Sequence, residues 1–469
     1  MGSLKILVVS CGLALLAGCA FQKYRAAPLA PAQTAASLQA RTLADPGLRQ
    51  YMAEKSRMPP STWPLSQWKL PELTLAAFYY NPALRVARAQ LAQAEAAIVT
   101  ARARPNPTAS GDVGGETAPE SPWIAGFVGS LPLETAGKRA HRVTAAERSA
   151  DAMRWNLAVI AWKVRAQVRS ALLEYTSATV GLALLQKEER LRAEQTLLLG
   201  QRLAVGIIPR PELDAARIQH TQALLAATAG ETRRGQAQAA LAAAIGVPVS
   251  GLKGITFAWP DFDKPATSFS PAAIQQDAVL NRLDIREALA EYTASEAELR
   301  LQIARQYPDF NLGPDYAYEE GAHLFSIVIG LALPVFNRNQ GPVAESRARR
   351  ERMAAQFLAV QHAGIAQSEQ ALVKYHAALK QLSQARKLLQ QSRALEQAEQ
   401  TALRAGEGDR LALTGAQLQS AVTARAELNA VSEVQQALGD LENAVQRPLQ
   451  PGDIQPLSPQ SPLLRAARK

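Results

Sequence analysis

The feature that most constrains the fold is an apolar segment that passes directly into a long helical pattern. Residues 324–341 read LFSIVIGLALPVFNRNQG, an apolar run with Pro334 near its end and a polar turn after it. A pattern rich in Ala, Glu and Arg, typical of a helix, follows at once. A weaker copy stands 202 residues earlier, where residues 131–133 (LPL) match residues 333–335 (LPV) and residues 137–139 (GKR) open another helical run. Both halves of the chain therefore contain a strand that is followed by a very long helix.

The order of elements around this feature also repeats at a nearly constant distance. Matching pairs lie 201 residues apart before the strands and 200 residues apart after the second long helix; they include Ala103/Ala304, Pro107/Pro308, Gly206/Gly406, Leu213/Leu413 and Pro248/Pro448. Self-similarity at a fixed period indicates internal duplication. The sequence predicts a first repeat over residues 71–248, a linker over residues 249–270 and a second repeat over residues 271–448.

Each repeat is expected to hold one shorter helix, two strands and two long helices. The helical pattern of residues 73–104 ends at Pro105, and leucines recur every seven residues from Leu184 to Leu198, as in a coiled-coil seam. At a rise of 1.5 Å per residue, the helical run over residues 139–203 is roughly 100 Å long. Further long helices are predicted over residues 212–245 and 343–403, and strands over residues 108–117, 123–133, 309–319 and 324–336.

The N-terminus has the pattern of a targeting segment. Lys5 precedes an apolar run over residues 6–17, which is too short to cross a bilayer as a helix. The run ends in Leu16-Ala17-Gly18-Cys19, which resembles a bacterial lipobox. We expect a lipoprotein signal peptide over residues 1–18, acylation (palmitate) on Cys19 and an extended, lipidated tether over residues 19–70. Ala20 in place of Asp resembles lipoproteins of the outer membrane; the alternative is a plain secretory signal with an incidental cysteine.

Composition and motifs argue against an enzyme, a metal site or a nucleic-acid partner. The two cysteines are Cys11 and Cys19, so the mature chain is expected to lack disulfides and thiolate sites. The formal charge is +10, but Lys and Arg are scattered along helical patterns among Glu and Gln, which favours solvated helix faces. The five histidines have no spacing suited to a metal, and no phosphate loop, nucleophile elbow or catalytic carboxylate pair is present. We expect no catalytic residue, no metal and no cofactor.

The strand patterns alternate between apolar and polar residues. Phe325, Ile327 and Ile329 would share one face, and Asn311 and Asp315 would lie on the polar face of the preceding strand. Strands of this length can span a bilayer, and apolar-out, polar-in alternation is typical of a transmembrane barrel. A soluble sheet with one wet face shows the same alternation. Pro314 would also remove a ladder hydrogen bond, unless a bulge accommodates it.

The number of strands narrows these choices. Bacterial barrels need at least about eight strands, and an open sheet of four cannot lie in lipid because its edges would be unsatisfied. If the strands span a membrane, several chains must therefore share one closed barrel. A barrel of about eight strands, from a dimer, is filled by its own side chains, whereas about twelve, from a trimer, can leave a channel. A trimer with a pore is the functional interpretation.

Together, the duplicated plan, the lipobox and the two strand-to-helix junctions resemble the TolC-type outer-membrane efflux factors over about residues 70–448. The resemblance implies a mainly α-helical fold with a transmembrane β part, in which a homotrimer in outer-membrane lipid of a Gram-negative bacterium forms a 12-stranded barrel. A long helical barrel would continue it into the periplasm. It also implies two protein partners, a periplasmic adaptor and an inner-membrane proton-driven transporter, and no chemistry on this subunit.

The segments 131–139 (LPLETAGKR) and 333–341 (LPVFNRNQG) further resemble the CzcC-type branch, which exports heavy-metal cations. The expected function is thus the exit duct of a tripartite heavy-metal efflux system. A duct for organic toxicants and a structural coiled-coil lipoprotein without a channel are the alternatives.

The resemblance also assigns candidate residues at the periplasmic tip. The adaptor would contact the two helix turns, at Val205, Gly206, Leu213, Gly406 and Leu413. Some members of the family close the tip with aspartates, but this chain has Ala412 and Gly415 at the positions that align with them. The nearest acids are Asp214, Glu407 and Asp409, which are either gate residues or solvated turn residues.

Four acids on the predicted strands are candidate lumen residues: Asp112, Glu116, Asp315 and Glu319. Threefold symmetry would repeat each one around the lumen, and such rings raise the local concentration of cations. An ordinary wet lumen wall explains them equally well.

Overall fold

The computed structural model describes residues 22–55, 62–115, 123–265, 269–319, 321–450, 453–454 and 457–464. The chain divides into two compact units, Met1–Arg41 and Thr42–Lys469. In the first unit, the described residues form an irregular segment and then the exposed helix α2 (Pro31–Gln39). Cys19 and the lipobox lie outside the described residues. The second unit contains all the other elements.

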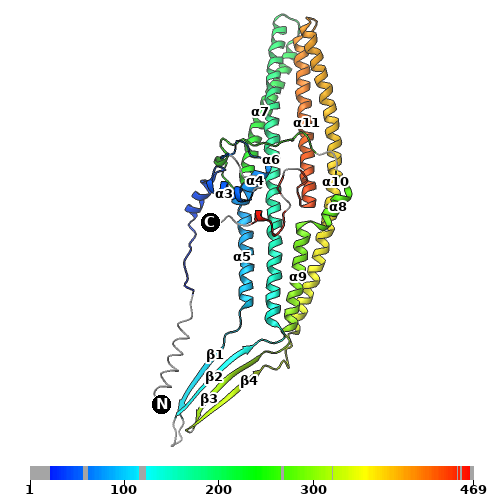
Figure 1. Ribbon diagram of the computed structural model, residues 1–469. Helices are drawn as coiled ribbons and strands as arrows, with labels where there is room; N and C mark the ends of the chain where they lie inside the picture. Colours follow the sequence, from blue (N-terminus) through cyan, green and yellow to red (C-terminus); the bar gives the residue numbers. More distant parts are fainter. Residues whose placement is uncertain are drawn as a thin grey trace. The chain divides into compact units, whose positions relative to one another are not determined.

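The second unit repeats one order of elements (Figure 1). The first copy is α5 (Pro82–Arg102), β1 (Thr108–Gly115), β2 (Trp123–Leu133), α6 (Lys138–Ala204) and α7 (Arg210–Ile245). The second copy is α9 (Leu283–Ala304), β3 (Phe310–Glu319), β4 (Ala322–Leu331), α10 (Gln340–Arg404) and α11 (Arg410–Val445). Helices α6 and α10 have 67 and 65 residues, and α7 and α11 have 36 each. The predicted mainly helical chain with four strands is confirmed.

Shorter elements surround this repeated frame. They are α3 (Pro46–Lys55), α4 (Leu70–Tyr80), α8 (Pro271–Leu280) and the 3₁₀ turns Val249–Leu252 and Pro462–Leu464. The single helix predicted over residues 73–104 is in fact α4 followed by α5. The break lies at Asn81, whose side chain accepts a hydrogen bond from the Ala83 N–H at 2.9 Å, and Pro82 begins α5 because the first helical position needs no N–H partner.

In each repeat, the N-cap residue of the shorter helix (α5 or α9) bonds to the end of the second long helix (α7 or α11). Asn81 donates from Nδ2 to the carbonyl of Ala244 near the end of α7, at 3.0 Å. In the second repeat Arg282, which is buried, donates from Nη1 to the carbonyl of Ala444 near the end of α11, at 2.8 Å. Two different side chains therefore satisfy corresponding helix-terminal carbonyls, which otherwise lack partners within the helix.

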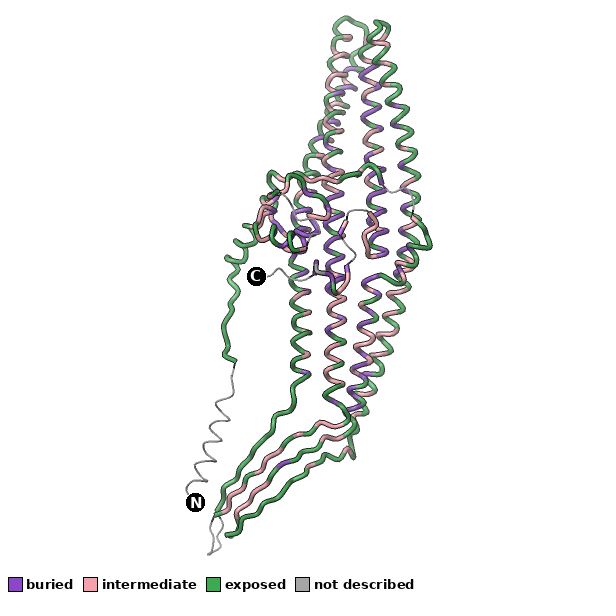
Figure 2. The backbone as a smooth tube through the Cα atoms, viewed as in Figure 1, coloured by how far each residue is buried: buried purple, intermediate pink, exposed green. Residues whose placement is uncertain are grey.

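The predicted extended tether over residues 19–70 is wrong for its second half. Leu48, Tyr51 and Met52 of α3 are buried with Trp68 in the largest core cluster, against α4 and α6 (Figure 2). Tyr51 donates to the carbonyl of Leu463 in the C-terminal tail at 3.0 Å. Proline content suggested an extended chain here, but burial of large apolar side chains outweighs that local preference. The tail over residues 449–469 contributes Ile454, Leu457, Leu463 and Leu464 to the same cluster.

A second core cluster joins α10 and α11 with the short helix α8. Ala278, Ala378 and Ala437 are fully or almost fully buried there beside Tyr375 and Leu438. Small side chains let the helix axes approach closely, which explains why an Ala-rich, aromatic-poor sequence packs as long hairpins. None of the helices in the described part of the chain combines the length and apolar character needed to cross a membrane.

The four strands form one antiparallel sheet in the order β1-β2-β3-β4. β4 ends at Leu331, five residues before the predicted end, because the chain turns tightly where the Val335 N–H donates to the carbonyl of Leu333. Pro314 needs no bulge, since the β2–β3 register is the same on both sides of it. Gly129 leaves room instead: a Cβ on this residue would lie 3.0 Å from Pro314 Cδ.

Candidate functional site

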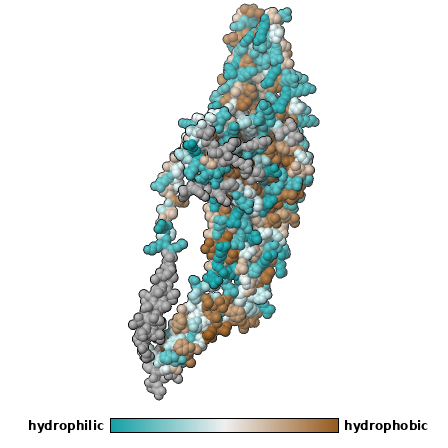
Figure 3. Space-filling view, viewed as in Figure 1, coloured by the Kyte–Doolittle hydropathy of each residue, from teal (hydrophilic) through white to brown (hydrophobic). Residues whose placement is uncertain are grey.

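One face of the sheet is apolar and exposed. The strand register sets Phe127, Tyr316 and Phe325 in one cross-strand row, and Leu131, Leu312 and Ile329 form another. In β4, Phe325, Ile327 and Ile329 are 81%, 74% and 69% exposed. Figure 3 shows hydrophobic side chains gathered over the strands. A continuous apolar surface of this kind on a folded chain indicates contact with lipid or with another protein.

The opposite face carries the predicted acids. The register places Asp112, Asp315 and Glu319 on this face, and Asp315 accepts a hydrogen bond from Ser326 Oγ at 2.8 Å. The Asp112 carboxylate lies over Gly126, where an added Cβ would come within 2.4 Å of its Oδ1. Glu116, the fourth predicted acid, lies outside the described residues. The face therefore carries negative charge, opposite to a face with apolar side chains.

The sheet is open at both edges. Among the described strands, β1 pairs only with β2 and β4 pairs only with β3. Unpaired N–H and C=O groups along an edge can pair with another strand, and in lipid they must do so. The sheet thus has two edges and an apolar face that the single chain leaves without partners.

At the first strand-to-helix junction, cations cap the end of α5. The chain enters α6 through Gly137, which has φ of 67°. Arg139 Nε donates to the carbonyl of Arg102 at 2.9 Å, and Arg142 Nε donates to that of Ala101 at 3.0 Å. The last carbonyls of a helix lack intrahelical partners and carry partial negative charge, so guanidinium groups suit them. Glu134 in turn pairs with Arg142.

The second junction reaches the corresponding carbonyl with a different side chain. Asn339 precedes α10 in the left-handed conformation, with φ of 59°, and its Nδ2 donates to the carbonyl of Gln302 at 2.7 Å. Gln302 in α9 corresponds to Ala101 in α5. The Asn339 N–H donates to Asn337 Oδ1 at 2.9 Å, and the Arg338 N–H donates to Gln340 Oε1 at 2.7 Å. The segment 337–341 therefore turns the chain through local hydrogen bonds. No group of three or more His, Cys, Asp or Glu among the described residues is arranged to hold a metal ion.

The far ends of the long helices have matching turns. The N–H groups of Gly206 and Ile207 donate back to the carbonyls of Leu203 and Arg202, and those of Gly406 and Glu407 donate to the carbonyls of Leu403 and Ala402. Both are Schellman motifs, with glycine at φ of 73° and 81°. Val205, 70% exposed, and Ile207, 68% exposed, give the first turn an apolar tip.

The predicted adaptor-contact residues at these turns have different surroundings. Gly206 and Gly406 are exposed like Val205. Leu213 and Leu413 are only 5% and 3% exposed, and Leu213 packs with Leu199 of α6. In this structure the two leucines therefore hold the hairpins together and present almost no surface to another protein.

The predicted tip acids also separate into distinct environments. Asp409 caps α11 by accepting a hydrogen bond from the Leu411 N–H at 3.1 Å, and Arg202 Nη2 of α6 lies 2.5 Å from its Oδ2. The hydrogen bond from Arg202, followed by that from the Leu411 N–H, lowers the pKa of Asp409. Asp214 pairs within its own helix, with Arg217 at 3.3 Å and Arg210 at 3.6 Å. Glu407 is exposed in the turn itself.

A second contact between the two repeats at this end was not predicted. Arg410 at the start of α11 donates from Nε to Glu194 Oε1 of α6 at 2.7 Å. Arg210 is its counterpart in the first repeat, 200 residues earlier. The signal that could have found the contact is an arginine at the same position of both turns, together with the acid Glu194 near the end of the first long helix.

Comparison with known protein families now applies to this geometry. Residues 76–247 and 274–445 each match a family described as Outer membrane efflux protein. The chain belongs to this family. The two matched segments are equal in length, and each runs from a short helix through two strands to the end of the second long helix. The two family matches therefore cover both repeats, including the strand-to-helix junctions and the turns between the long helices.

Individual relatives agree with this assignment. The chain is 28% identical over 281 residues to the cobalt-zinc-cadmium resistance protein CzcC of Cupriavidus metallidurans, an alignment that covers 59% of this chain and 65% of the relative. The outer membrane protein VceC of Vibrio cholerae is similar in structure, with a TM-score of 0.65 at 18% identity over 80% of this chain and 95% of VceC. A membrane protein of Pseudomonas aeruginosa gives a TM-score of 0.66 at 19% identity, over 91% and 99% of the two chains. At these identities the structures establish the fold alone.

Proposed function

We propose that the chain is one subunit of the outer-membrane exit duct of a tripartite efflux system. Three copies would join their sheets, β4 of one to β1 of the next, into a twelve-stranded barrel. The observation that carries the proposal is the sheet, which combines an exposed apolar face, an acidic opposite face and two unpaired edges. Closure by identical copies satisfies both edges at once, which lipid alone cannot do.

The long helices supply the rest of the duct. In each copy α6 and α10 run from the sheet to the two turns, and α7 and α11 return from the turns along them. We infer that three sets of these helices form a tunnel through the periplasm. The equal element order and the two equal family matches support internal duplication as the origin of this plan. The subunit would transport without catalysing a reaction. Its energy would come from an inner-membrane proton-driven transporter.

The turns are the proposed contact with the periplasmic adaptor. Val205, Gly206 and Gly406 are exposed there and offer backbone and apolar surface. Asp214, Glu407 and Asp409 are the proposed tip acids, and among these three Asp409 pairs with a residue of the other repeat, Arg202. Lipid on Cys19 would hold the N-terminus in the outer membrane of a Gram-negative bacterium.

We further propose heavy-metal cations as the cargo. The resistance to cobalt, zinc and cadmium in the name of the CzcC relative supports this choice. So does the acidic face, where Asp112, Asp315 and Glu319, together with Glu116, would recur three times around the lumen and attract cations.

Two experiments test the duct and its cargo separately. Protein extracted in detergent should have the mass of a trimer and should give single-channel conductance in planar bilayers. Monomers without conductance would leave a structural role as the remaining function. In cells, deletion should lower tolerance to zinc, cadmium, cobalt, nickel or copper. Unchanged metal tolerance with new sensitivity to organic toxicants would reject the metal cargo and retain the duct.

A further inference from the structure

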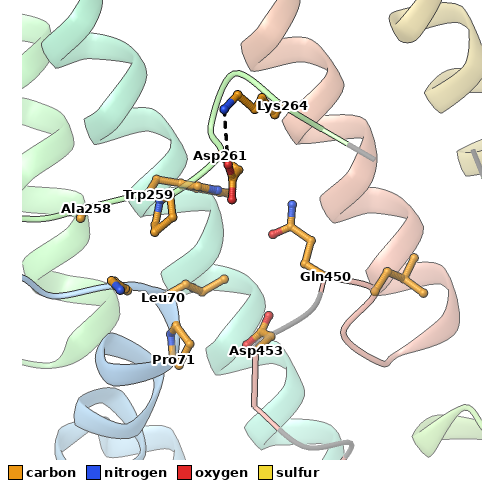
Figure 4. A pocket seen from close by; sticks show the side chains of 11 residues that line it. Leu70, Pro71, Ala258, Trp259, Asp261, Lys264, Gln450 and Asp453 are labelled. Carbon is orange, nitrogen blue, oxygen red and sulfur yellow. Dashed lines mark ion pairs between the residues drawn. The ribbon is translucent and has the colours of Figure 1, made fainter. Parts of the chain in front are cut away.

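A pocket of about 430 Å³ lies where three segments meet beside the helices (Figure 4). They are the start of α4, the loop over residues 258–264 and the tail after α11. All the described residues that line the pocket fall outside the two segments that match the family, 76–247 and 274–445. The repeated duct architecture therefore does not account for this pocket. Its volume is in the range of small-molecule sites.

Buried charged residues hold two of the pocket's walls in place. The guanidinium carbon of Arg169 lies 5.3 Å from the centroid of the Trp259 ring, and Phe262 meets that ring edge-on. Arg165, fully buried in α6, pairs with Asp453 and also with Glu442 of α11, the latter at 3.0 Å. Side chains that are already fixed reduce the conformational entropy that the protein loses when a ligand binds. The walls are thus organised before any ligand arrives.

Space for this arrangement is also built into the backbone. An added Cβ on Gly439 in α11 would lie 2.3 Å from Arg169 Nη1, so a larger residue there would displace the arginine beneath Trp259. Gln435, fully buried, donates from Nε2 to the carbonyl of Phe262 at 2.9 Å and fixes the loop that carries Trp259. α11 and α6 thus position a loop that lies outside both repeats.

The chemistry of the lining favours a neutral, hydroxyl-rich ligand. The lining carries two lysines, Lys69 and Lys264, and two aspartates, Asp261 and Asp453, so its formal charges sum to zero. Lys264 lies 4.0 Å from Asp261, and Asp453 is already paired with Arg165. In Figure 4 the Trp259 side chain borders the pocket on one side, with Gln450 and Asp453 on the opposite side. An aromatic ring offers an apolar face, and amide and carboxylate groups supply donors and acceptors around it.

We propose that this pocket binds a saccharide. One sugar ring would lie against Trp259, and its hydroxyl groups would hydrogen-bond to Gln450, Asp453 and Lys264. The C–H face of a sugar ring is apolar and its rim is polar, which matches an indole bordered by polar groups. The ligand is either a free sugar or a segment of a glycan polymer. The site lies outside both segments that match the family, so it would add a binding function to the duct.

The test uses the full-length protein in detergent and N,N′-diacetylchitobiose as the probe, with calorimetry and ligand-observed NMR. We expect saturable binding by the wild type. Gln450→Ala should weaken it by roughly fivefold, the equivalent of one hydrogen bond of about 1 kcal/mol. Trp259→Ala should abolish it, and Trp259→Phe, which keeps an aromatic ring on Arg169, should retain part. Lys264→Ala, which removes a proposed hydrogen bond to the sugar, should also weaken binding. Lys253→Ala should not, since Lys253 is an exposed lysine outside the pocket lining.

Several outcomes would overturn the proposal. The first is absence of saturable binding by the folded wild type. The second is binding of the disaccharide by Gln450→Ala and Trp259→Ala with the same affinity as the wild type. The third is binding of the zwitterion Ala-Ala in place of the disaccharide. Co-sedimentation with isolated cell-wall glycan, competed by the disaccharide, would identify the polymer as the source. Disaccharide binding without co-sedimentation would identify a free sugar. Bilayer conductance should be equal in Gln450→Ala and wild type, so failure of the duct and failure of the pocket are separate results.

Discussion

The two repeats share one frame but differ wherever charged side chains connect their parts. At the strand-to-helix junctions, two arginines cap α5, whereas one asparagine reaches α9. At the turns, the N-cap residue of α11 is Asp409, which makes a side-chain cap and an ion pair, whereas the N-cap residue of α7 is Pro209, which makes no side-chain cap. At the helix ends, Ala242 stands in α7 where Glu442 stands in α11. The backbone plan therefore tolerates several side-chain solutions, and the differences show which contacts depend on a side chain that only one repeat provides.

The largest loss of stability is expected from Glu442→Ala, which gives the second repeat the alanine that the first repeat has at Ala242. Glu442 Oε2 lies 3.0 Å from Arg165 Nη2 and 3.2 Å from Arg169 Nε, and all three residues are buried. Removing one partner of a buried ion pair leaves uncompensated charge and typically costs about 3–5 kcal/mol. Thermal and urea unfolding should show this loss. Glu433→Ala, an exposed glutamate on the same helix, is the control, and equal stability of the two variants would contradict the expectation.

Arg142→Ala is expected to cause the next largest loss of stability. Arg142 donates to the carbonyls of Ala101 and Ala103 and pairs with Glu134, so the substitution uncovers the end of α5 and a carboxylate. Hydrogen bonds to charged groups contribute about 1.5–3 kcal/mol. Unfolding should show a loss of that size, and hydrogen exchange should show fraying at residues 101–103. Arg148→Ala, which removes an exposed arginine of α6, should leave both unchanged.

At the second junction, Asn339 allows the backbone and side-chain contributions to be separated. Asn339→Gly keeps a residue that adopts φ of 59° easily but loses the hydrogen bond to Gln302, at a net cost of about 1 kcal/mol. Asn339→Ala loses the same bond and adds left-handed strain of about 1–2 kcal/mol. Unfolding of the two variants should therefore rank Gly above Ala in stability. The reverse order would mean that the left-handed turn is not maintained in solution.

The sequence predicted the helices and strands better than it predicted the contacts between them. Helical periodicity and the 200-residue repeat located the long helices to within a few residues, and strand alternation placed Asp112 and Asp315 on one face. The buried ion cluster was not predicted, because Arg165 and Glu442 are 277 residues apart and each resembles a solvated charge in its own helix. For the same reason the contact of Tyr51 with Leu463, 412 residues away, was missed and the segment was interpreted as tether. Local patterns specify elements, whereas long-range pairing depends on how the elements assemble.

The smallest effect is expected at Asp409, which tests whether the difference between the turns matters. Its folded-state pKa is lowered, so its contribution to stability is present above the unfolded-state value near 4 and is lost as the pH falls through the lower folded-state value. Because Asp409 and Arg202 are both about one-third to one-half exposed, the pair contributes less than about 1 kcal/mol.

Hydrogen exchange at Leu411 is the sensitive measurement, because its N–H donates to Asp409. As the pH falls below about 4, protection of this amide, corrected for intrinsic exchange, should fall in the wild type but not in Asp409→Asn. Asp214→Asn should behave as the wild type does. Protection that declines equally in all three proteins would show that the cap and ion pair unique to the second turn do not stabilise it. The two turns would then be equivalent despite their different sequences, and the glycine-based backbone motif alone would hold each of them.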